Sequence, residues 1–203
     1  ALAATHIVGL HTNVAFLRRV VASQSFATAD LDTALIEREA AVLLKQPPLA
    51  LEVAAAGVVA HALADEAGAE ADDPWSRRDG WRLHGGARRH FDLQHAGALH
   101  AVALARPHAA AADQALALQI GDQRWPLRAR ALGGGRHDVT LGERRLQLAV
   151  YAHGERVAVF APDHSAVLQQ IDAIAHAGEG AAEGGQLTAP MPGKVISFLA
   201  KAG

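Results

Sequence analysis

The sequence contains no cysteine, and its charges nearly cancel. The absence of cysteine excludes a disulfide framework, a thiolate metal site and a cysteine nucleophile, and it is typical of a protein of the reducing cytoplasm. With 19 Lys and Arg against 21 Asp and Glu, the formal net charge is -2. Affinity for nucleic acids and anionic membranes comes mainly from clustered Lys and Arg. We therefore expect neither a nucleic acid nor a membrane as a partner.

Long hydrophobic runs are also absent. The longest such run, LALEVAAAGVVAHALA at 49–64, carries Glu52 and His61. It is shorter than the roughly 20 residues that a membrane-spanning helix needs. The sequence does not open with the basic region, apolar core and cleavage site of a signal peptide. We therefore expect a soluble, cytoplasmic protein.

Recognisable catalytic and metal-binding motifs are missing as well. The 12 histidines are scattered, without an HExxH pattern or acidic partners at ligand spacing. The glycine runs at 84–86 and 133–135 lack the Lys-Ser/Thr of a phosphate loop, and no Ser lies in a G-x-S-x-G elbow. We predict no catalytic, metal-binding or cofactor-binding residue in this chain. His61 is expected to be a structural histidine with hydrogen-bond partners, and its role stays open.

The first part of the chain, residues 1–46, has apolar residues at helical spacing. Residues 12–23 predict a helix that Thr12 or Asn13 can cap, because a short side-chain oxygen accepts a free backbone N–H of the first turn. The helical pattern continues through 26–43. These residues predict an N-terminal helical segment.

A long apolar helix is predicted to follow Pro47-Pro48, because proline suits the first turn of a helix. It would span about 49–65, and only Glu52 and His61 on it are strongly polar. A helix that is apolar nearly all round must be surrounded by other elements.

The region 87–171 changes to the alternating apolar and polar pattern of β-strands. The turns between strands are too short for crossover helices, so the sheet should be antiparallel. Eight strands can close into a barrel, and we expect alanines on the strands to make room inside for the apolar helix. The sequence therefore predicts an α+β fold, mainly an antiparallel eight-stranded β-barrel around a long apolar helix. The candidate strands are 88–95, 99–106, 114–120, 124–132, 137–141, 144–152, 156–162 and 165–172.

Two connectors flank this core. The first, 65–86, is acidic and rich in turn residues, and it holds the interface candidates Trp75, Trp81 and Arg82. Exposed aromatic residues often carry much of the binding energy of an interface. The alternative is that both tryptophans pack against their own barrel. The second connector, 175–186, is rich in Gly and Ala and reads as a flexible linker.

The end of the chain, LTAPMPGKVISFLAKAG at 187–203, resembles the first strands of a biotinyl carrier domain of biotin-dependent carboxylases. In that family biotin is held by the lysine of an A-M-K-M hairpin further downstream. The sequence has a single Met, so no A-M-K-M is present, and neither Lys194 nor Lys201 is at the biotinyl position. The signature residues of this resemblance are Pro190, Met191, Pro192 and Gly193.

Two further segments resemble parts of the same enzymes. Residues 9–38 are similar to the last helices of a biotin carboxylase domain. DDPWSRRDGWRLHG at 72–85 resembles a D-P-W-x-x-x-D-G-W-R-L-N/G segment in the linking domain of the methylcrotonyl-CoA carboxylase type, with His84 in place of the usual Asn.

The resemblance implies a piece of the α subunit of a biotin-dependent acyl-CoA carboxylase. Its implied domains are the end of the biotin carboxylase domain (1–46), the linking or BT domain (47–174), the linker (175–186) and the incomplete start of the carrier domain (187–203). ATP and Mg²⁺ would bind upstream of this chain, and biotin would be attached beyond Gly203. The parent would be an enzyme and this part of it inactive.

The implied role is to dock the biotin carboxylase and carrier domains onto the carboxyltransferase β subunit. The expected substrate of the parent is 3-methylcrotonyl-CoA, with geranyl-CoA or another acyl-CoA as the alternative. An interpretation of another class is a small-ligand-binding β-barrel. That interpretation requires an empty interior, which a helix inside the barrel would fill.

Overall fold

The structure is a computed structural model of the 203-residue chain, and it describes residues 2–10, 12–44, 48–78, 80–106, 116–162, 164–172 and 174–176. Ala1–Ile171 form one compact unit, and a second unit begins at Asp172. The expected start of a carrier domain at 187–203, with its signature from Pro190 to Gly193, lies outside the described residues, as does nearly all of the expected linker.

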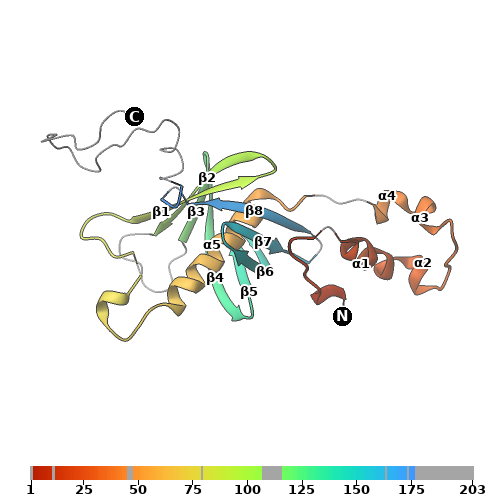
Figure 1. Ribbon diagram of the computed structural model, residues 1–203, viewed down its shortest axis with the longest axis horizontal. Coiled ribbons are helices and arrows are strands. Elements are labelled where there is room, and N and C mark those ends of the chain that lie inside the picture. Colours follow the sequence, from red (N-terminus) through yellow and green to blue (C-terminus); the bar gives the residue numbers. More distant parts are fainter. Residues whose placement is uncertain are drawn as a thin grey trace, which may run out of the picture. The chain divides into compact units, whose positions relative to one another are not determined.

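Eight antiparallel strands form a closed barrel, as the alternating pattern predicted (Figure 1). Each strand pairs with the next along the chain, and β8 closes the barrel by pairing with β1, where Asp92 lies opposite Ile171. The strands are β1 (Ala87–His95), β2 (Ala98–Arg106), β3 (Leu116–Ile120), β4 (Gln123–Gly133), β5 (Arg136–Leu141), β6 (Arg144–His153), β7 (Arg156–Phe160) and β8 (Ser165–Ile171).

Three of the hairpins turn over two residues that begin with glycine. Gly121, Gly142 and Gly154 have φ values of 55°, 60° and 56°. Tight hairpin loops need this left-handed conformation, which glycine adopts without steric cost. The turns predicted from the sequence are therefore confirmed, and they fix the register of the strands on both sides.

The apolar helix α5 (Leu51–Gly68) runs inside the barrel (Figure 1). All eight residues from Val53 to Ala60 are buried, and they belong to one core with strand residues such as Leu118 and Val159. The predicted arrangement of a barrel around a helix is confirmed. Because α5 and its contacts occupy the core, the interpretation as an empty small-ligand barrel is wrong.

Much of the space for α5 comes from the helix itself. The buried stretch of α5 contains four alanines and Gly57, whereas most strand residues of the same core are large and apolar. Of the strand alanines that were expected to make room, Ala166 belongs to this core and Ala129 packs against it. The large strand residues that share this core with α5 include Leu93, Val102, Leu104, Leu118, Leu127, Val139, Leu148 and Leu168.

Helix α5 begins two residues later and ends three residues later than predicted. Its N-cap is Ala50, without a side-chain capping bond, so Pro48 lies before the helix and not in its first turn. Pro47 lies outside the described residues. At the other end the helix continues to Gly68.

The N-terminal segment holds a single-turn 3-10 helix, η1 (Leu2–Ala4), and four helices, of which only the first exceeds one turn. The predicted continuous helical pattern over 26–43 is wrong, because the chain leaves helical geometry after Thr28 and Ala29 has a φ of 58°. Asp32 holds the break by accepting a bond from the backbone N–H of Ala34 at 3.1 Å, since Asp side chains compete with helical bonds. Asn13 is the N-cap of α1, but its side chain makes no capping bond. The helices are α1 (Val14–Ala22), α2 (Gln24–Ala27), α3 (Leu35–Arg38) and α4 (Ala40–Leu43).

His6 and Arg18 are two residues of the N-terminal segment that contact the barrel region. The His6 ring stacks on Phe160 with centroids 4.6 Å apart, and its Nδ1 shares a hydrogen bond of 3.1 Å with the hydroxyl of Tyr151. Burial, and then the Arg18 charge, lower the pKa of His6. Arg18 itself donates to the carbonyl of Pro162.

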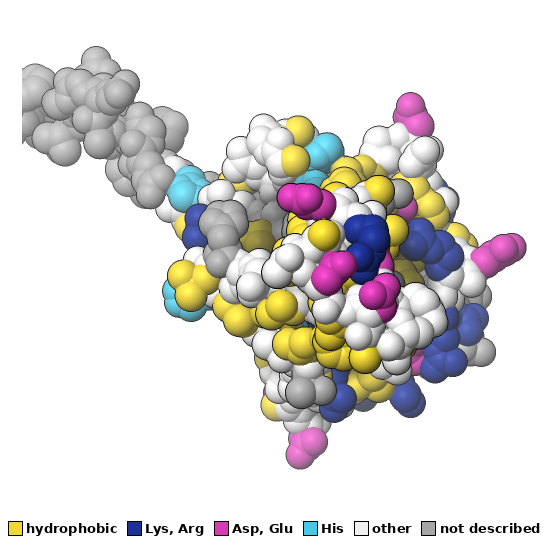
Figure 2. All heavy atoms as spheres, turned by 90° about the vertical axis from the view of Figure 1, so that its right-hand side faces the viewer, with side chains coloured by type: hydrophobic (Ala, Val, Ile, Leu, Met, Phe, Trp, Pro, Cys, Tyr) yellow, Lys and Arg dark blue, Asp and Glu magenta, His cyan; other side chains and the backbone are white. Residues whose placement is uncertain are grey.

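The helices α1 to α4 expose many apolar side chains, which Figure 2 shows gathered on the side that faces the viewer. Among the described residues, no helix has both the length and the hydropathy to cross a membrane. The exposed apolar residues of these helices and the chain after them are Leu17, Val21, Phe26, Leu31, Ile36, Val42 and Leu44.

Candidate docking surface

The connector after α5 is fixed by hydrogen bonds of its own. A carboxylate oxygen of Asp73 accepts bonds from the backbone N–H groups of Trp75 at 2.8 Å and Ser76 at 3.1 Å. These bonds cap the short 3-10 helix η2 (Pro74–Ser76), whose first residue is proline. The Ser76 hydroxyl oxygen lies 2.9 Å from both the N–H and the carbonyl of Ala71. The connector is therefore an ordered turn.

Both ends of this turn are tied to the barrel. Glu66, near the end of α5, pairs with Arg89 on β1 and lies 3.6 Å from Arg106 on β2. On the return path, Gly80 approaches so closely that a Cβ there would lie 3.1 Å from the Cβ of Ala87. The connector thus contacts the barrel at both Glu66 and Gly80.

The aromatic side chains of the connector are exposed. Trp75 is 96% exposed and Trp81 71%, so neither is buried against the barrel, and the alternative that they pack there is wrong. Arg82 donates from Nη1 to the carbonyl of Trp81 at 3.1 Å. Leu83 is 69% exposed beside them, and sequence reasoning missed it although it belongs to the same W-R-L stretch. All three predicted interface residues are therefore exposed.

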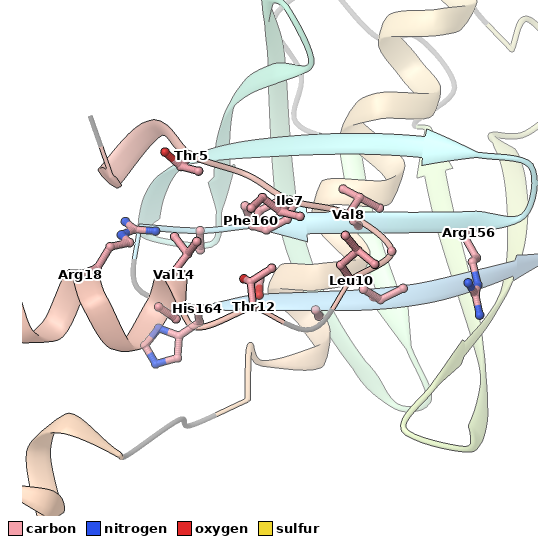
Figure 3. Close-up of a pocket in the computed structure, with 17 residues that line it drawn as sticks. Thr5, Ile7, Val8, Leu10, Thr12, Val14, Arg18, Arg156, Phe160 and His164 are labelled. Atoms are coloured by element: carbon pink, nitrogen blue, oxygen red, sulfur yellow. The ribbon is translucent and has the colours of Figure 1, made fainter. Parts of the chain in front are cut away.

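A groove that the sequence did not predict lies between the N-terminal segment and strands β7 and β8 (Figure 3). Its volume is about 420 Å³. Ile7, Val8 and Phe160 contribute apolar walls, while Arg18 and Arg156 lie toward opposite ends. The stacking of His6 on Phe160 holds this segment beside β7, and the groove lies between them.

His61 lies where α5 leaves the fully buried part of the core. Its Nε2 is 3.4 Å from a carboxylate oxygen of Asp65, one turn further along the helix. Its ring meets the ring of His137 edge to face, with centroids 5.7 Å apart. Asp65 is therefore a neighbour of His61, while the expected hydrogen-bond partners of this histidine remain a prediction.

His137 is the buried histidine that sequence reasoning missed. It is 2% exposed, and within the part of the chain that the structure describes neither ring nitrogen has a hydrogen-bond partner. Burial, and secondarily the neighbouring His61, lower the pKa of His137, whereas Asp65 acts weakly in the opposite direction. The signal was available, because His137 alternates with Val139 and Leu141 on the inward face of β5.

The described part of the chain brings no three His, Asp or Glu side chains together in a way that could hold a metal ion. His61, Asp65 and His137 lie near one another at the edge of the core. The described residues thus form a close-packed barrel and a connector with exposed tryptophans.

Residues 48–173 match the family model of the methylcrotonyl-CoA carboxylase α-subunit BT domain. The match covers α5, the connector and all eight strands, which are the elements that the sequence assigned to one linking domain. A BT domain is a linking module of a biotin-dependent carboxylase α subunit, so the parent protein is a carboxylase. The chain belongs to this family of carboxylase α-subunit BT domains.

Proposed function

We propose that this chain docks the α subunit of an acyl-CoA carboxylase onto its carboxyltransferase β subunit. The observation that carries the proposal is the ordered connector with its two exposed tryptophans. Large aromatic residues that become buried at an interface supply much of its binding energy. A turn that is already held by Asp73 and Ser76 loses little conformational entropy on binding.

The chain itself carries out no chemical step in this proposal. The barrel around α5 is a rigid mount, since its interior is close-packed. We place ATP and Mg²⁺ on the biotin carboxylase domain upstream and biotin on a carrier-domain lysine downstream of Gly203. The resemblance of residues 9–38 and 187–203 to these domains supports that placement. A cytoplasmic location is part of the proposal, and the absence of cysteine supports it.

The docking proposal is tested by measuring the affinity of the chain for the purified β subunit with surface plasmon resonance. We expect binding by the wild-type chain and a loss of at least about tenfold in W75A/W81A, since a buried tryptophan contributes 2 kcal/mol or more at many interfaces. The control is L99A, which removes a 62% exposed leucine from β2. The absence of any binding by the wild-type chain would reject the proposal, as would equal losses in the two variants.

We further propose that the parent enzyme acts on 3-methylcrotonyl-CoA. The name of the matching family model and the D-P-W to R-L stretch at 73–83 support this choice. The assembled α and β subunits should carboxylate 3-methylcrotonyl-CoA with a higher kcat/KM than geranyl-CoA. The reverse preference would assign the enzyme to geranyl-CoA and leave the docking proposal intact.

A further inference from the structure

We propose that the groove between the N-terminal segment and strands β7 and β8 binds an aliphatic dicarboxylate of medium chain length. The groove has a volume of about 420 Å³ and lies on the outside of the barrel (Figure 3). This volume is within the roughly 300–1,000 Å³ that is typical of small-molecule sites. Of the described residues that line the groove, none belongs to the tryptophan connector, so the proposal is independent of docking to a β subunit.

The floor of the groove follows from the alternation of side chains along β7. Val157 and Val159 belong to the core around α5. Arg156, Ala158 and Phe160 therefore share the opposite, outer face of the strand. All three outer residues line the groove. Ala158 has the smallest side chain of the three and lies between the two larger ones, which leaves room for a ligand chain along the strand.

The walls of the groove are apolar and accessible. Ile7, Val8 and Leu10 of the N-terminal segment line it together with Val167 of β8. The least exposed of these four side chains, that of Ile7, is still 41% exposed. Each methylene group that such a surface removes from water strengthens binding by up to about fourfold. An aliphatic chain is therefore the complement of the central part of the groove.

An arginine lies toward each end of the groove (Figure 3). Arg156 is the first residue of β7, and Arg18 donates to the carbonyl of Pro162, just beyond the end of this strand. The described lining residues include no Asp or Glu. Glu155 precedes Arg156, but it accepts a hydrogen bond of 3.0 Å from the side-chain amide of Gln169. Charge complementarity therefore favours a ligand with an anionic group at each end over a neutral hydrocarbon.

The spacing of the two ends sets the length of the ligand. Arg156 and Phe160 are the two ends of β7, which are about 13 Å apart in an extended strand. Dodecanedioate, with eleven carbon–carbon bonds of about 1.5 Å, can span this distance. Each of its carboxylates can form paired, charge-assisted hydrogen bonds with a guanidinium group. Succinate is too short to reach both arginines. We therefore commit to the long dicarboxylate and treat an apolar peptide with acidic ends as a competing outcome.

The test measures the affinity of the complete 203-residue chain for dodecanedioate, dodecanoate and succinate by isothermal titration calorimetry. Ionic strength is held constant, and the acids stay below micelle-forming concentrations. We expect dodecanedioate to bind about threefold to fivefold more tightly than dodecanoate, which is the upper range for one additional exposed charge pair. Succinate should show no measurable binding. R156Q should bind both twelve-carbon acids equally, whereas the matched control R88Q, which removes an exposed arginine of β1, should keep the preference.

A second variant tests the apolar wall separately from the charged end. V167A should weaken the binding of dodecanedioate and dodecanoate by the same factor, up to about fifteenfold, because it removes apolar contacts that both chains make. The preference for the dicarboxylate should remain. A loss of this preference in V167A, with no loss in R156Q, would contradict the assignment of the charged end to Arg156. Circular dichroism of all variants verifies that the barrel is folded.

The remaining outcomes would overturn the proposal. Dodecanoate binding as tightly as dodecanedioate would exclude a site with two cationic ends, and so would the same preference in R156Q and R88Q. Methyl NMR shifts that leave Ile7 and Val8 unchanged during titration would place the ligand elsewhere. If a hexapeptide with four leucines between two glutamates binds and dodecanedioate does not, the groove is a docking surface for a protein segment instead.

Discussion

Gly57 on α5 faces Val159 on β7 so closely that a Cβ at Gly57 would lie 2.7 Å from a methyl carbon of the valine. Carbon atoms of real side chains do not come this close. The side chain of Val159 therefore packs directly against the backbone of α5 at Gly57. The contact lies in the middle of the buried stretch of α5. It explains why the helix carries a glycine at a position where glycine lowers helix propensity.

The variant G57A is therefore expected to destabilise the protein. Overpacking of a filled core costs about 1–3 kcal/mol, which exceeds the roughly 1 kcal/mol that alanine gains in helix propensity. The measurement is the free energy of unfolding in urea. The control is G68A on the same helix, where a new Cβ meets nothing within 4 Å and should not destabilise.

A second variant separates overpacking from other causes. In G57A/V159A the new methyl group occupies space that Val159 has left, so the double variant should lose less than the sum of the two single variants. Strictly additive losses, or a G57A protein as stable as G68A, would contradict the close approach.

Stability should fall with decreasing pH because of His137. Its pKa is lowered by burial and by His61, so the unfolded state binds the proton more readily than the folded state. The stabilisation is complete above the pKa of about 6.5 in the unfolded chain and is lost as the pH falls below it. The slope is at most about 1.4 kcal/mol per pH unit for one proton. Measurements of urea unfolding between pH 7.5 and 5.5 give this slope directly.

The variant H137L removes the buried ring, whose two nitrogens have no hydrogen-bond partner among the described residues. Its unfolding free energy should depend less on pH than that of the wild type. Some slope will remain, because the pKa of His6 is also lowered, by burial and by Arg18. The matched control is H90L on β1, where the histidine is exposed. An unchanged slope in H137L would show that another group controls the acid sensitivity.

Much of this fold was predictable because its patterns are local. The alternation in β5 and β6 and the glycine turns at Gly121, Gly142 and Gly154 each depend on a few consecutive residues. The enclosure of α5 followed from its lack of a polar face. Long-range placement was not predictable. The stacking of His6 on Phe160 and the meeting of His61 with His137 join residues far apart in the chain, and no local pattern encodes them.

The sequence predicted which residues form the candidate docking surface, but it did not predict whether their side chains are exposed. The sequence could identify Trp75 and Trp81 as unusual residues in a turn-rich connector, yet packing on the barrel remained an alternative. In the structure Glu66 and Gly80 make contacts with β1 and β2, while both tryptophans are exposed. These contacts depend on β1 and β2, which the connector sequence does not specify.

The variant Y151F should loosen the N-terminal segment without affecting the barrel. It removes the hydroxyl that shares a hydrogen bond with His6, a bond expected to contribute about 1 kcal/mol. Amide hydrogen exchange in residues 5–10 should therefore accelerate about fivefold, while exchange in the barrel strands stays the same. V42A, which truncates an exposed side chain of α4, is the control. Equal exchange in Y151F and wild type would mean that ring stacking alone holds the segment.

The variant D73A tests whether the shape of the connector matters for docking. The change removes the acceptor for the N–H groups of Trp75 and Ser76 but leaves both tryptophans in place. Loss of such a cap costs about 0.5–2 kcal/mol locally. Because the connector lies outside the core, the free energy of global unfolding should not change. The affinity for the β subunit should fall about twofold to thirtyfold, since the turn must then be ordered during binding.

The neighbouring variant D72A supplies the control for charge. It removes the same negative charge one residue earlier, where no capping bond to η2 is made. If docking depends on a preorganised turn, D73A weakens binding and D72A does not. Equal weakening by the two variants would assign the effect to electrostatic attraction, and no weakening by D73A would mean that the tryptophans bind equally well from a disordered connector. A further comparison, of D73A with W75A/W81A, separates the cost of ordering the turn from the contribution of the aromatic contacts themselves.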